Sequence, residues 1–543
     1  MTKEPVKNQE KYNNFLQGIL DKKAYQTASD LSSALVRKFD VSEEYSRKII
    51  SRATTQKAIK SSSPYTFGKG QFIYLKNKTN IDTGIVKAAS KINRPPIYRL
   101  IDLLEKNDGI VSYYEALKVT ASPTEKSSTK VDSLDDILSF LTGLNLIHQK
   151  RDGNGVNYVI LKNKKNVNEL YLPGLMAAHF SKMVLDSAIL PDILRWLQRT
   201  NLIDNSKFVY RNKKTPQIGA KHSNLVWDAF AYTRTTGINP ILGAKAQDRG
   251  SQTLVVLDVV LAQEYSNTHL DGFINRIQIH RNSVKETTRK ILPIVIFKTC
   301  TATTLGRLRK AGILTYDLSA IFGTKIYQVI SAFHELSQSL LYNSDIENTI
   351  EQILTSIKDA GQEDALRELR GTLFEFLMYP LLKTLYSNAN IERAKKLSYT
   401  HDNGDEETYE YDYIIDSSNP SELVFIELKG YQQGAYISKG DRNKKASLKW
   451  FFERTLSVAE KVYHDRIANG RQAKAVFITS ANFWEDGKKF ITAMNKSRYK
   501  SKVLNTGYER EDLLELLAKL DLNTEVNVIK KFYGRSENFE DEE

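Results

Sequence analysis

The sequence predicts a multidomain protein of mixed α+β and α/β type, with helix-rich modules towards the N-terminus and α/β domains in the centre and at the C-terminus. The chain has 543 residues, and one hydrophobic core organises only about 100–200. Along the chain, amphipathic helices with short hairpins give way to long apolar strands separated by helices. We expect four units at residues 1–80, 81–168, 169–330 and 331–543.

Composition and charge narrow the class of protein. The chain is 41% hydrophobic and 26% charged, as in ordinary globular proteins. Its formal net charge of +14 favours a polyanionic partner, because neutralised phosphates release their counterions. The alternative is a solubilising lysine surface. Cys300 is the single cysteine, which excludes an internal disulfide and a cysteine-based zinc cluster. With no run of about 18 apolar residues, we expect a cytoplasmic protein without membrane contact.

The first unit is expected to contain two helices followed by a short two-stranded hairpin. Thr27–Phe39 is expected to form one helix, and Ser42 caps a second helix that runs to Ile59. Glycine-containing turns and the strand Gln71–Leu75 follow as a wing, and this order of elements resembles a winged-helix module. The basic residues on and after the second helix are the candidate DNA contacts: Arg47, Lys48, Arg52 and Lys57.

The pattern recurs in the second unit. Three short helices are expected between Pro96 and Leu141, and the segments Leu144–Gln149 and Val156–Leu161 follow as a hairpin. Lys118–Asp132 has the composition of an exposed loop. The alternative role for such modules is packing against proteins instead of DNA.

The centre of the chain changes to α/β patterning. Apolar runs predict buried strands at Thr253–Leu261 and Ile291–Thr299, with a shorter strand near Ile313–Tyr316. Two long helices, Tyr327–Tyr342 and Asp345–Leu369, then lead into the C-terminal domain.

In the C-terminal domain, a helix and the two strands that follow it carry acidic side chains that are candidate metal ligands. The helix Arg370–Leu385 carries Glu375, and a charged loop separates it from the strand Thr408–Asp416. In the next strand, Leu423–Lys429, the period of two puts Glu427 and Lys429 on one face. Phosphodiester hydrolysis needs a hard cation with oxygen ligands. We expect Mg²⁺ or Mn²⁺ on the ligand set of Asp412, Glu427, the Leu428 carbonyl and, through water, Glu375.

Glu375, Asp412 and the tripeptide Glu427-Leu428-Lys429 together resemble the motif of the PD-(D/E)XK restriction-endonuclease-like nucleases. The resemblance implies a restriction-endonuclease-like α/β core in which Glu375, Asp412, Glu427 and Lys429 are catalytic. Tyr411 stands where the family often has proline before the aspartate. A helix at Leu448–Ile467 and a strand at Ala473–Ser480 continue the family's order of elements. The alternative is a surface hairpin or a relative that does not cut.

Between the tripeptide and the next helix lies a basic and aromatic stretch suited to phosphate contact and base stacking. Its aromatic members are Tyr431, Tyr436 and Trp450. Its polar members are the second group of candidate nucleic-acid contacts: Gln432, Lys439, Arg442, Lys444, Lys445 and Lys449. The alternative is a solvated helix start with a buried tryptophan.

The central domain has a similar order of strands and acidic residues but lacks part of the catalytic motif. Asp228 and Asp258 stand like the two acidic residues, but Val260 replaces the lysine and no clear helical glutamate precedes Asp228. We interpret this domain as degenerate and nuclease-like, with Asp228 and Asp258 as candidates for a weak metal site. Simple α/β coincidence is the alternative. The residues that follow give a further candidate nucleic-acid contact: Arg276, His280 and Arg281.

The sequence therefore predicts a divalent-metal-dependent DNA endonuclease, with duplex DNA positioned by the winged-helix modules, in restriction or defence against mobile elements. Two alternatives remain: a non-catalytic DNA-binding regulator or assembly subunit, and an RNA-processing nuclease. P-loop, serine-elbow and H-E-x-x-H motifs do not occur, so neither ATP hydrolysis nor serine or zinc hydrolase chemistry is expected. One cutting core per chain is compatible with a homodimer and with an activating protein partner.

Overall fold

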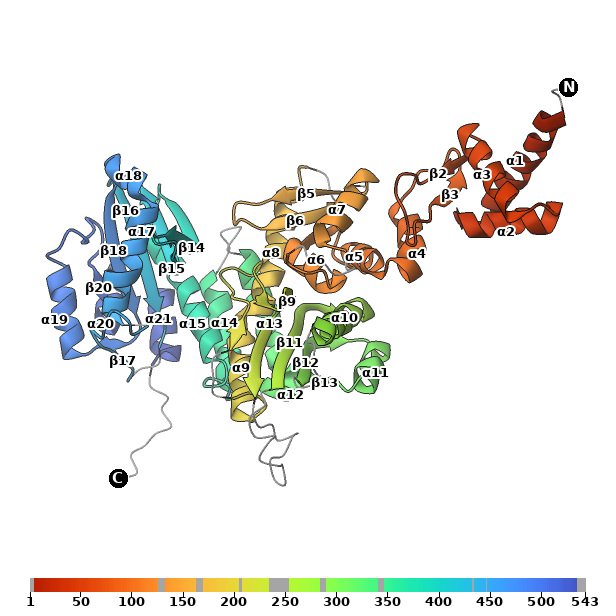
Figure 1. Ribbon diagram of the computed structural model, residues 1–543. Helices are drawn as coiled ribbons and strands as arrows, with labels where there is room; N and C mark the ends of the chain where they lie inside the picture. The colour runs from red at the N-terminus through yellow and green to blue at the C-terminus, as the bar shows by residue number, and fades with distance from the viewer. Residues whose placement is uncertain are drawn as a thin grey trace.

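Figure 1 shows the computed structural model of the chain, a multidomain protein of mixed α and β structure. The N-terminal module projects from the rest of the molecule, the C-terminal domain lies at the opposite end, and the central domain lies between them. The structure describes residues 4–125, 132–162, 169–204, 208–233, 253–283, 290–339, 346–431, 434–445 and 447–534.

The N-terminal module contains three helices and a small sheet of order β1-β3-β2. Its elements are α1 (Glu4–Lys22), β1 (Gln26–Thr27), α2 (Ala28–Phe39), α3 (Glu43–Thr55), β2 (Ile59–Ser61) and β3 (Ile73–Lys76). Thr27 starts α2 through a reciprocal capping box with Asp30, and Ser42 caps α3 by accepting from the Tyr45 amide. α3 ends at Thr55, four residues before the expected Ile59, and Ile59 instead begins β2. The helix α1 was not expected from the sequence.

The second module contains four helices and a three-stranded sheet of order β4-β6-β5. Its elements are α4 (Thr83–Asn93), α5 (Pro95–Lys106), β4 (Ile110–Ser112), α6 (Tyr113–Thr120), α7 (Leu134–Gly143), β5 (Ile147–Arg151) and β6 (Asn157–Leu161). The predicted loop Lys118–Asp132 is wrong at its start, because Lys118 and Thr120 are buried residues of α6. The segment 126–131 lies outside the described residues.

The central domain is built on a five-stranded sheet of order β13-β12-β11-β10-β7. β7 and β11 pair with β10 antiparallel, whereas β12 and β13 extend the sheet in parallel. The elements are α8 (Leu172–Ala188), α9 (Leu190–Arg199), β7 (Val209–Tyr210), β8 (Ala220–His222), β9 (Leu225–Trp227), β10 (Ala229–Thr233), β11 (Thr253–Tyr265), α10 (Asn267–Ser283), β12 (Ile291–Cys300), α11 (Ala302–Lys310), β13 (Leu314–Asp317) and α12 (Leu318–Phe322).

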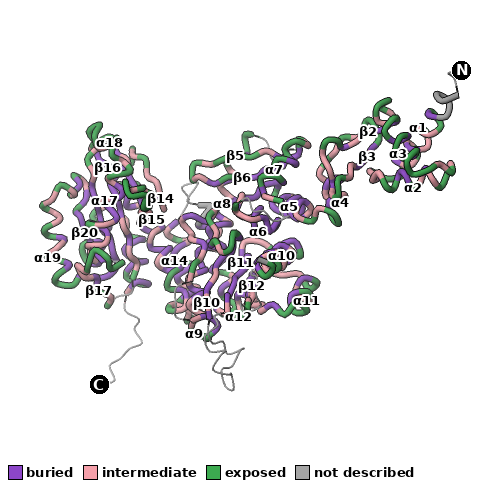
Figure 2. Tube along the Cα trace, viewed as in Figure 1, coloured by how far each residue is buried: buried purple, intermediate pink, exposed green. Residues whose placement is uncertain are grey.

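A helical layer joins the central and C-terminal sheets (Figure 1). It contains α13 (Ile326–Ser339), α14 (Ile346–Asp359), α15 (Arg367–Leu377) and α16 (Tyr379–Leu385). The second predicted helix therefore ends at Asp359 and not at Leu369, and the predicted helix Arg370–Leu385 is two helices that meet at Met378. One continuous apolar core includes buried residues of both domains, such as Leu257 and Ile426. Figure 2 shows the buried residues concentrated in the sheets and this layer.

The C-terminal sheet has the order β14-β15-β16-β18-β20. The elements of this domain are β14 (Asn390–Thr400), β15 (Glu406–Ser417), β16 (Glu422–Lys429), β17 (Tyr436–Ile437), the π-helical turn Trp450–Thr455, α17 (Leu456–Val462), α18 (His464–Ala468), β18 (Gln472–Thr479), β19 (Asn482–Phe483), α19 (Glu485–Met494), β20 (Gly507–Tyr508), α20 (Arg510–Lys519) and α21 (Asn523–Phe532). The expected charged loop before β15 is instead the edge strand β14, which pairs with β15 in antiparallel and is for the most part half-buried.

The two large sheets have the same sequence of strand directions. In the C-terminal sheet, β15 is antiparallel to both β14 and β16, and β18 and β20 continue in parallel. The central sheet repeats this arrangement with β10, β7, β11, β12 and β13. Within the described part of the chain, no helix has the length and apolar composition needed to cross a membrane.

Candidate active site

Asp412 and Glu427 lie side by side on adjacent strands of the C-terminal sheet. Tyr413 pairs with Ile426 across the antiparallel strands β15 and β16, so Asp412 and Glu427 are the next facing pair. The Leu428 amide donates to Asp412 Oδ2 over 2.6 Å, in place of a backbone partner. This bond fixes one carboxylate oxygen of Asp412 and leaves Oδ1 to interact with other groups.

Glu375 and Lys429 complete the predicted group from two directions. Lys429 Nζ contacts Glu427 Oε1 at 2.5 Å, as expected for side chains on one face of a strand. Glu375 lies on α15, and its backbone carbonyl accepts from the Tyr413 hydroxyl at 3.0 Å, which ties the helix to β15. Gly430, directly after β16, lets α15 lie close to the end of that strand, because a Cβ there would lie 2.4 Å from the Cβ of Phe374 on α15.

Two lysines of the central domain enter this group of carboxylates. Lys213 Nζ lies 2.9 Å from Glu375 Oε1 and 2.6 Å from Thr372 Oγ1. Lys214 Nζ pairs with Asp412 Oδ1, the oxygen that the Leu428 amide leaves unengaged. Each of the three carboxylates therefore has one lysine partner. These two lysines come from the turn after β7 and were not predicted from the sequence.

Burial and charge set the protonation of the group. Burial tends to raise the pKa of Asp412, but the ammonium groups of Lys214 and Lys429 outweigh it and hold that pKa below its ordinary value. Burial raises the pKa of Glu427, and the nearby Asp412 charge raises it further against the opposing effect of Lys429. Asp412 is therefore the carboxylate of this facing pair that holds its negative charge more firmly.

A cavity of about 620 Å³ opens beside the group. Its walls include Lys213, Glu375, Leu428, Lys429 and Tyr431. Glu375 and Lys429 are thus accessible to a ligand, whereas the Asp412 side chain is only 2% exposed. Lys213 and Lys429 are among the cationic side chains of its wall.

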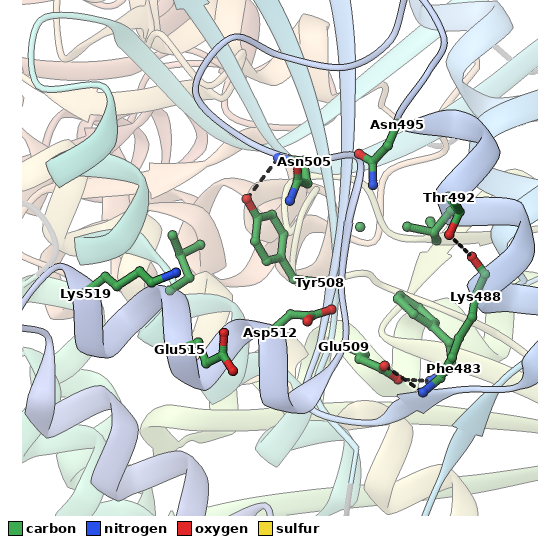
Figure 3. Close-up of a pocket in the computed structure, with 13 residues that line it drawn as sticks. Phe483, Lys488, Thr492, Asn495, Asn505, Tyr508, Glu509, Asp512, Glu515 and Lys519 are labelled. Atoms are coloured by element: carbon green, nitrogen blue, oxygen red, sulfur yellow. Dashed lines mark hydrogen bonds and ion pairs between the residues drawn. The ribbon is translucent and has the colours of Figure 1, made fainter.

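A second hollow, of about 410 Å³, lies elsewhere in the same domain (Figure 3). It is lined by residues of α19, β20 and α20, and Lys488 points towards Glu509 with an Nζ–Oε1 distance of 2.9 Å. None of the described site residues predicted from the sequence lines it. It is therefore separate from the carboxylate group.

The donor chemistry of the predicted site suits a hard divalent cation, since it consists of carboxylate oxygens. In the arrangement observed, however, no group of three or more Asp, Glu, His or Cys side chains among the described residues is placed to hold a metal ion. Lys213, Lys214 and Lys429 each contact one of the carboxylate oxygens of this group.

Comparison of the chain with known protein families, curated proteins and solved structures found no match. The assignment of the site therefore depends on its geometry.

The central domain contains an acidic group in the corresponding positions. Ala229 pairs with Leu257, which makes Asp228 and Asp258 the next facing pair, and the Val259 amide donates to Asp228 Oδ2 at 2.8 Å. This bond repeats the one between Leu428 and Asp412. A third acidic residue, Asp186, was not predicted from the sequence.

Asp186 occupies the position in the central domain that Glu375 occupies in the C-terminal domain. It lies on α8, three residues before the break between α8 and α9, as Glu375 lies three residues before the break between α15 and α16. A proline follows five residues after each, Pro191 and Pro380. This shared spacing is the signal in the sequence that identifies Asp186.

Buried cations fill the central acidic group. Lys118 Nζ pairs with Asp228 and lies 3.0 Å from Asp258 Oδ1, Arg276 lies 2.7 Å from Asp258, and Arg211 lies 3.1 Å from Asp228. Both aspartates are 0% exposed. Val260 stands where the C-terminal motif has Lys429, and Lys118 of the second module supplies an ammonium group to the acidic pair instead. Asp228 and Asp258 are thus enclosed in a buried ion-pair cluster and are not open to an ion from solvent.

The predicted nucleic-acid contacts lie in several places. Arg47, Lys48 and Arg52 lie on the exposed side of α3, where Lys48 Nζ contacts Glu44 at 2.6 Å, but Lys57 lies beyond the helix at a φ of 57°. Arg276 and His280 are 1% exposed and do not reach the surface, which overturns their predicted role, whereas Arg281 is exposed.

The predicted contacts of the C-terminal domain lie on an exposed segment. The exposed basic residues there are Arg442, Lys444 and Lys445, and Lys449 is half-buried beside Glu453. The Lys439 amide bonds to Asp486, and Gln432 lies outside the described residues. Trp450 is half-buried, and the cationic groups of Lys445 and Arg454 lie 6.0 and 4.9 Å from the centroid of its ring.

Proposed function

We propose that the protein is a divalent-metal-dependent endonuclease that hydrolyses phosphodiester bonds of DNA at the C-terminal carboxylate group. The observation that carries the proposal is the facing pair Asp412 and Glu427, with Lys429 on the same strand face and Glu375 on the adjoining helix, beside a cavity. The resemblance of these residues to the PD-(D/E)XK motif supports the same reaction.

Each residue has a distinct part in the proposed reaction. Asp412, Glu427 and the Leu428 carbonyl would hold the ion, and Glu375 would orient a water beside it. A bound Mg²⁺ or Mn²⁺ supplies charge neutralisation and a lowered pKa for an attacking water. Lys429, on the cavity wall, places its ammonium where it can neutralise the phosphate and position the water. The Leu428 amide holds the Asp412 carboxylate in place.

The other domains are better suited to binding nucleic acid and to positioning the C-terminal domain than to cleavage. The exposed cations on α3 and on the segment 439–449 are suited to phosphate contact. The central domain repeats the strand order and the acidic positions, but its charges are internally paired, so we propose that it is a degenerate copy that positions the C-terminal one. A microbial defence role belongs to the same proposal.

A second candidate is a non-catalytic DNA-binding or assembly protein. It is favoured by one observation: Lys213, Lys214 and Lys429 already neutralise the three carboxylates. Such a protein would bind nucleic acid with a steep salt dependence and form no product with any divalent ion.

A cleavage assay separates the two candidates. The purified chain is incubated with supercoiled plasmid, linear duplex, single-stranded DNA and RNA, in Mg²⁺, Mn²⁺ or EDTA. The endonuclease proposal expects a metal-dependent product from DNA that disappears in Asp412→Asn, Glu427→Gln and Lys429→Met. Asp416→Asn is the matched control, because Asp416 lies on the same strand and pairs with Arg466 and Arg471 away from the group. Binding without product in all conditions would favour the second candidate.

A further inference from the structure

The turn Arg211–Lys214 connects the two acidic groups of the molecule. Arg211 lies 3.1 Å from Asp228 in the central group, while Lys213 and Lys214 contact Glu375 and Asp412 in the C-terminal group. Four consecutive residues thus supply three cations to two sites in different domains. The central domain thereby reaches directly into the proposed active site.

The turn is held firmly in this position. The Arg211 amide donates to the Asp228 carbonyl at 2.7 Å, and its guanidinium lies over the Tyr114 ring at 4.8 Å. Asn212 Oδ1 accepts from the Lys214 amide at 2.9 Å, which is a turn closed by the asparagine side chain. Asn212 Nδ2 also donates to Glu410 on β15 at 3.1 Å. The two lysines are therefore presented to the carboxylates by an ordered backbone.

Charge balance shows what the lysines do to the group. Glu375, Asp412 and Glu427 carry three negative charges, and Lys429 offsets one of them. The two negative charges that remain are the charge that one divalent cation would neutralise. Lys213 and Lys214 supply that same double positive charge. The Lys214 ammonium also occupies Asp412 Oδ1, while Oδ2 is bound to the Leu428 amide. A divalent ion and Lys214 cannot both use that oxygen fully.

We infer that Lys213 and Lys214 are resident counter-ions of the C-terminal carboxylate group, and that a divalent cation binds there by displacing them. The inference rests on the proposed metal site, but it concerns the occupancy of that site and not its chemistry. Movement of the Lys213 and Lys214 side chains away from Glu375 and Asp412 becomes the step that opens the site, while the backbone of the turn stays in place.

Mn²⁺ binding to the full chain tests this directly, with the electron paramagnetic resonance signal of free Mn²⁺ as the readout. The double variant Lys213→Met/Lys214→Met is expected to bind Mn²⁺ at least about tenfold more tightly than the wild type, because apparent affinity scales with the fraction of molecules whose site is open. Adding Glu427→Gln should remove the gain. Lys221→Met, an exposed lysine on nearby β8, is the matched control and should leave the affinity unchanged. Equal or weaker Mn²⁺ binding by the double variant would overturn the inference.

A second measurement uses the wild-type chain and does not depend on how the variants fold. Amine-specific labelling followed by peptide mass spectrometry reports the accessibility of Lys213 and Lys214. Saturating Mn²⁺ should increase the labelling of both lysines several-fold and leave Lys221 unchanged, and unchanged labelling of the pair would contradict displacement. Neither readout requires cleavage, so tighter Mn²⁺ binding without any DNA product would uphold this inference and reject the proposed nuclease activity.

Discussion

Replacing Lys118 with methionine is expected to destabilise the central domain by about 3–5 kcal/mol, the usual effect of removing one partner of a buried ion pair. Lys118 lies between Asp228 and Asp258, and both carboxylates are 0% exposed. In this cluster three aspartates face three cations, so the variant has one uncompensated negative charge with no access to water. Methionine keeps most of the lysine volume, and the effect is therefore electrostatic.

Hydrogen exchange of the β11 amides measures this effect locally. If these amides exchange through opening of the domain, a loss of about 3–5 kcal/mol accelerates their exchange roughly 100- to 5,000-fold. The double variant Lys118→Met/Asp258→Asn restores the charge balance. The amide side chain that replaces the Asp258 carboxylate keeps an oxygen for Arg276, which lies 2.7 Å from Asp258 Oδ1, and its NH₂ group can donate to the Tyr265 hydroxyl.

The double variant should therefore recover at least half of the lost protection, as interacting sites do in a double-mutant cycle. Exchange within about threefold of the wild type in Lys118→Met would refute the reasoning. So would a double variant that is less stable than the single one.

Three further predictions concern other regions. Burial raises the pKa of Glu525 to about 7, and Glu347 adds to the shift. The free energy of unfolding should therefore fall as the pH rises from the ordinary glutamate pKa of 4.5 to about 7, because the folded state binds the proton more tightly than the unfolded state. Urea unfolding at pH 8 should show that Glu525→Gln abolishes this fall and raises the free energy of unfolding by about 1–2 kcal/mol, a value reduced for partial solvent screening. Tyr436 and Trp484 form a half-exposed aromatic pair at 4.7 Å, so Trp484→Ala should weaken single-stranded DNA binding by about 1–3 kcal/mol in a fluorescence titration, while unchanged binding would exclude stacking there. Arg52→Ala should weaken duplex binding and lower its salt-dependence slope by about one, and an unchanged slope would remove α3 from the DNA interface.

Strand periodicity and the order of elements sufficed to place the carboxylates. The alternation in Leu423–Lys429 correctly put Glu427 and Lys429 on one face, and the hairpin set Asp412 opposite Glu427. The same reasoning identified Asp228 and Asp258 as a similar pair. These successes have one cause: a hairpin fixes its register through local geometry that the sequence encodes directly.

The cations at both sites could not be predicted in this way. Lys118 reaches Asp228 from a helix 110 residues earlier in the chain, and Lys214 reaches Asp412 across 198 residues. Such contacts depend on how domains dock, for which periodicity carries no signal. β14 was missed for a related reason, because an edge strand facing solvent can be as polar as a loop.

The most direct test of the central claim is the rate at which Mn²⁺ or Mg²⁺ supports nicking of supercoiled plasmid by the wild type and by Glu427→Gln at matched DNA occupancy. The proposal expects a rate in the wild type that EDTA abolishes, and a loss of about a hundredfold or more in the variant, because the facing pair loses one of its two carboxylates. Equal rates in the two proteins would place the cutting site elsewhere. If neither the wild type nor the double variant Lys213→Met/Lys214→Met forms a product, the nuclease assignment itself is contradicted.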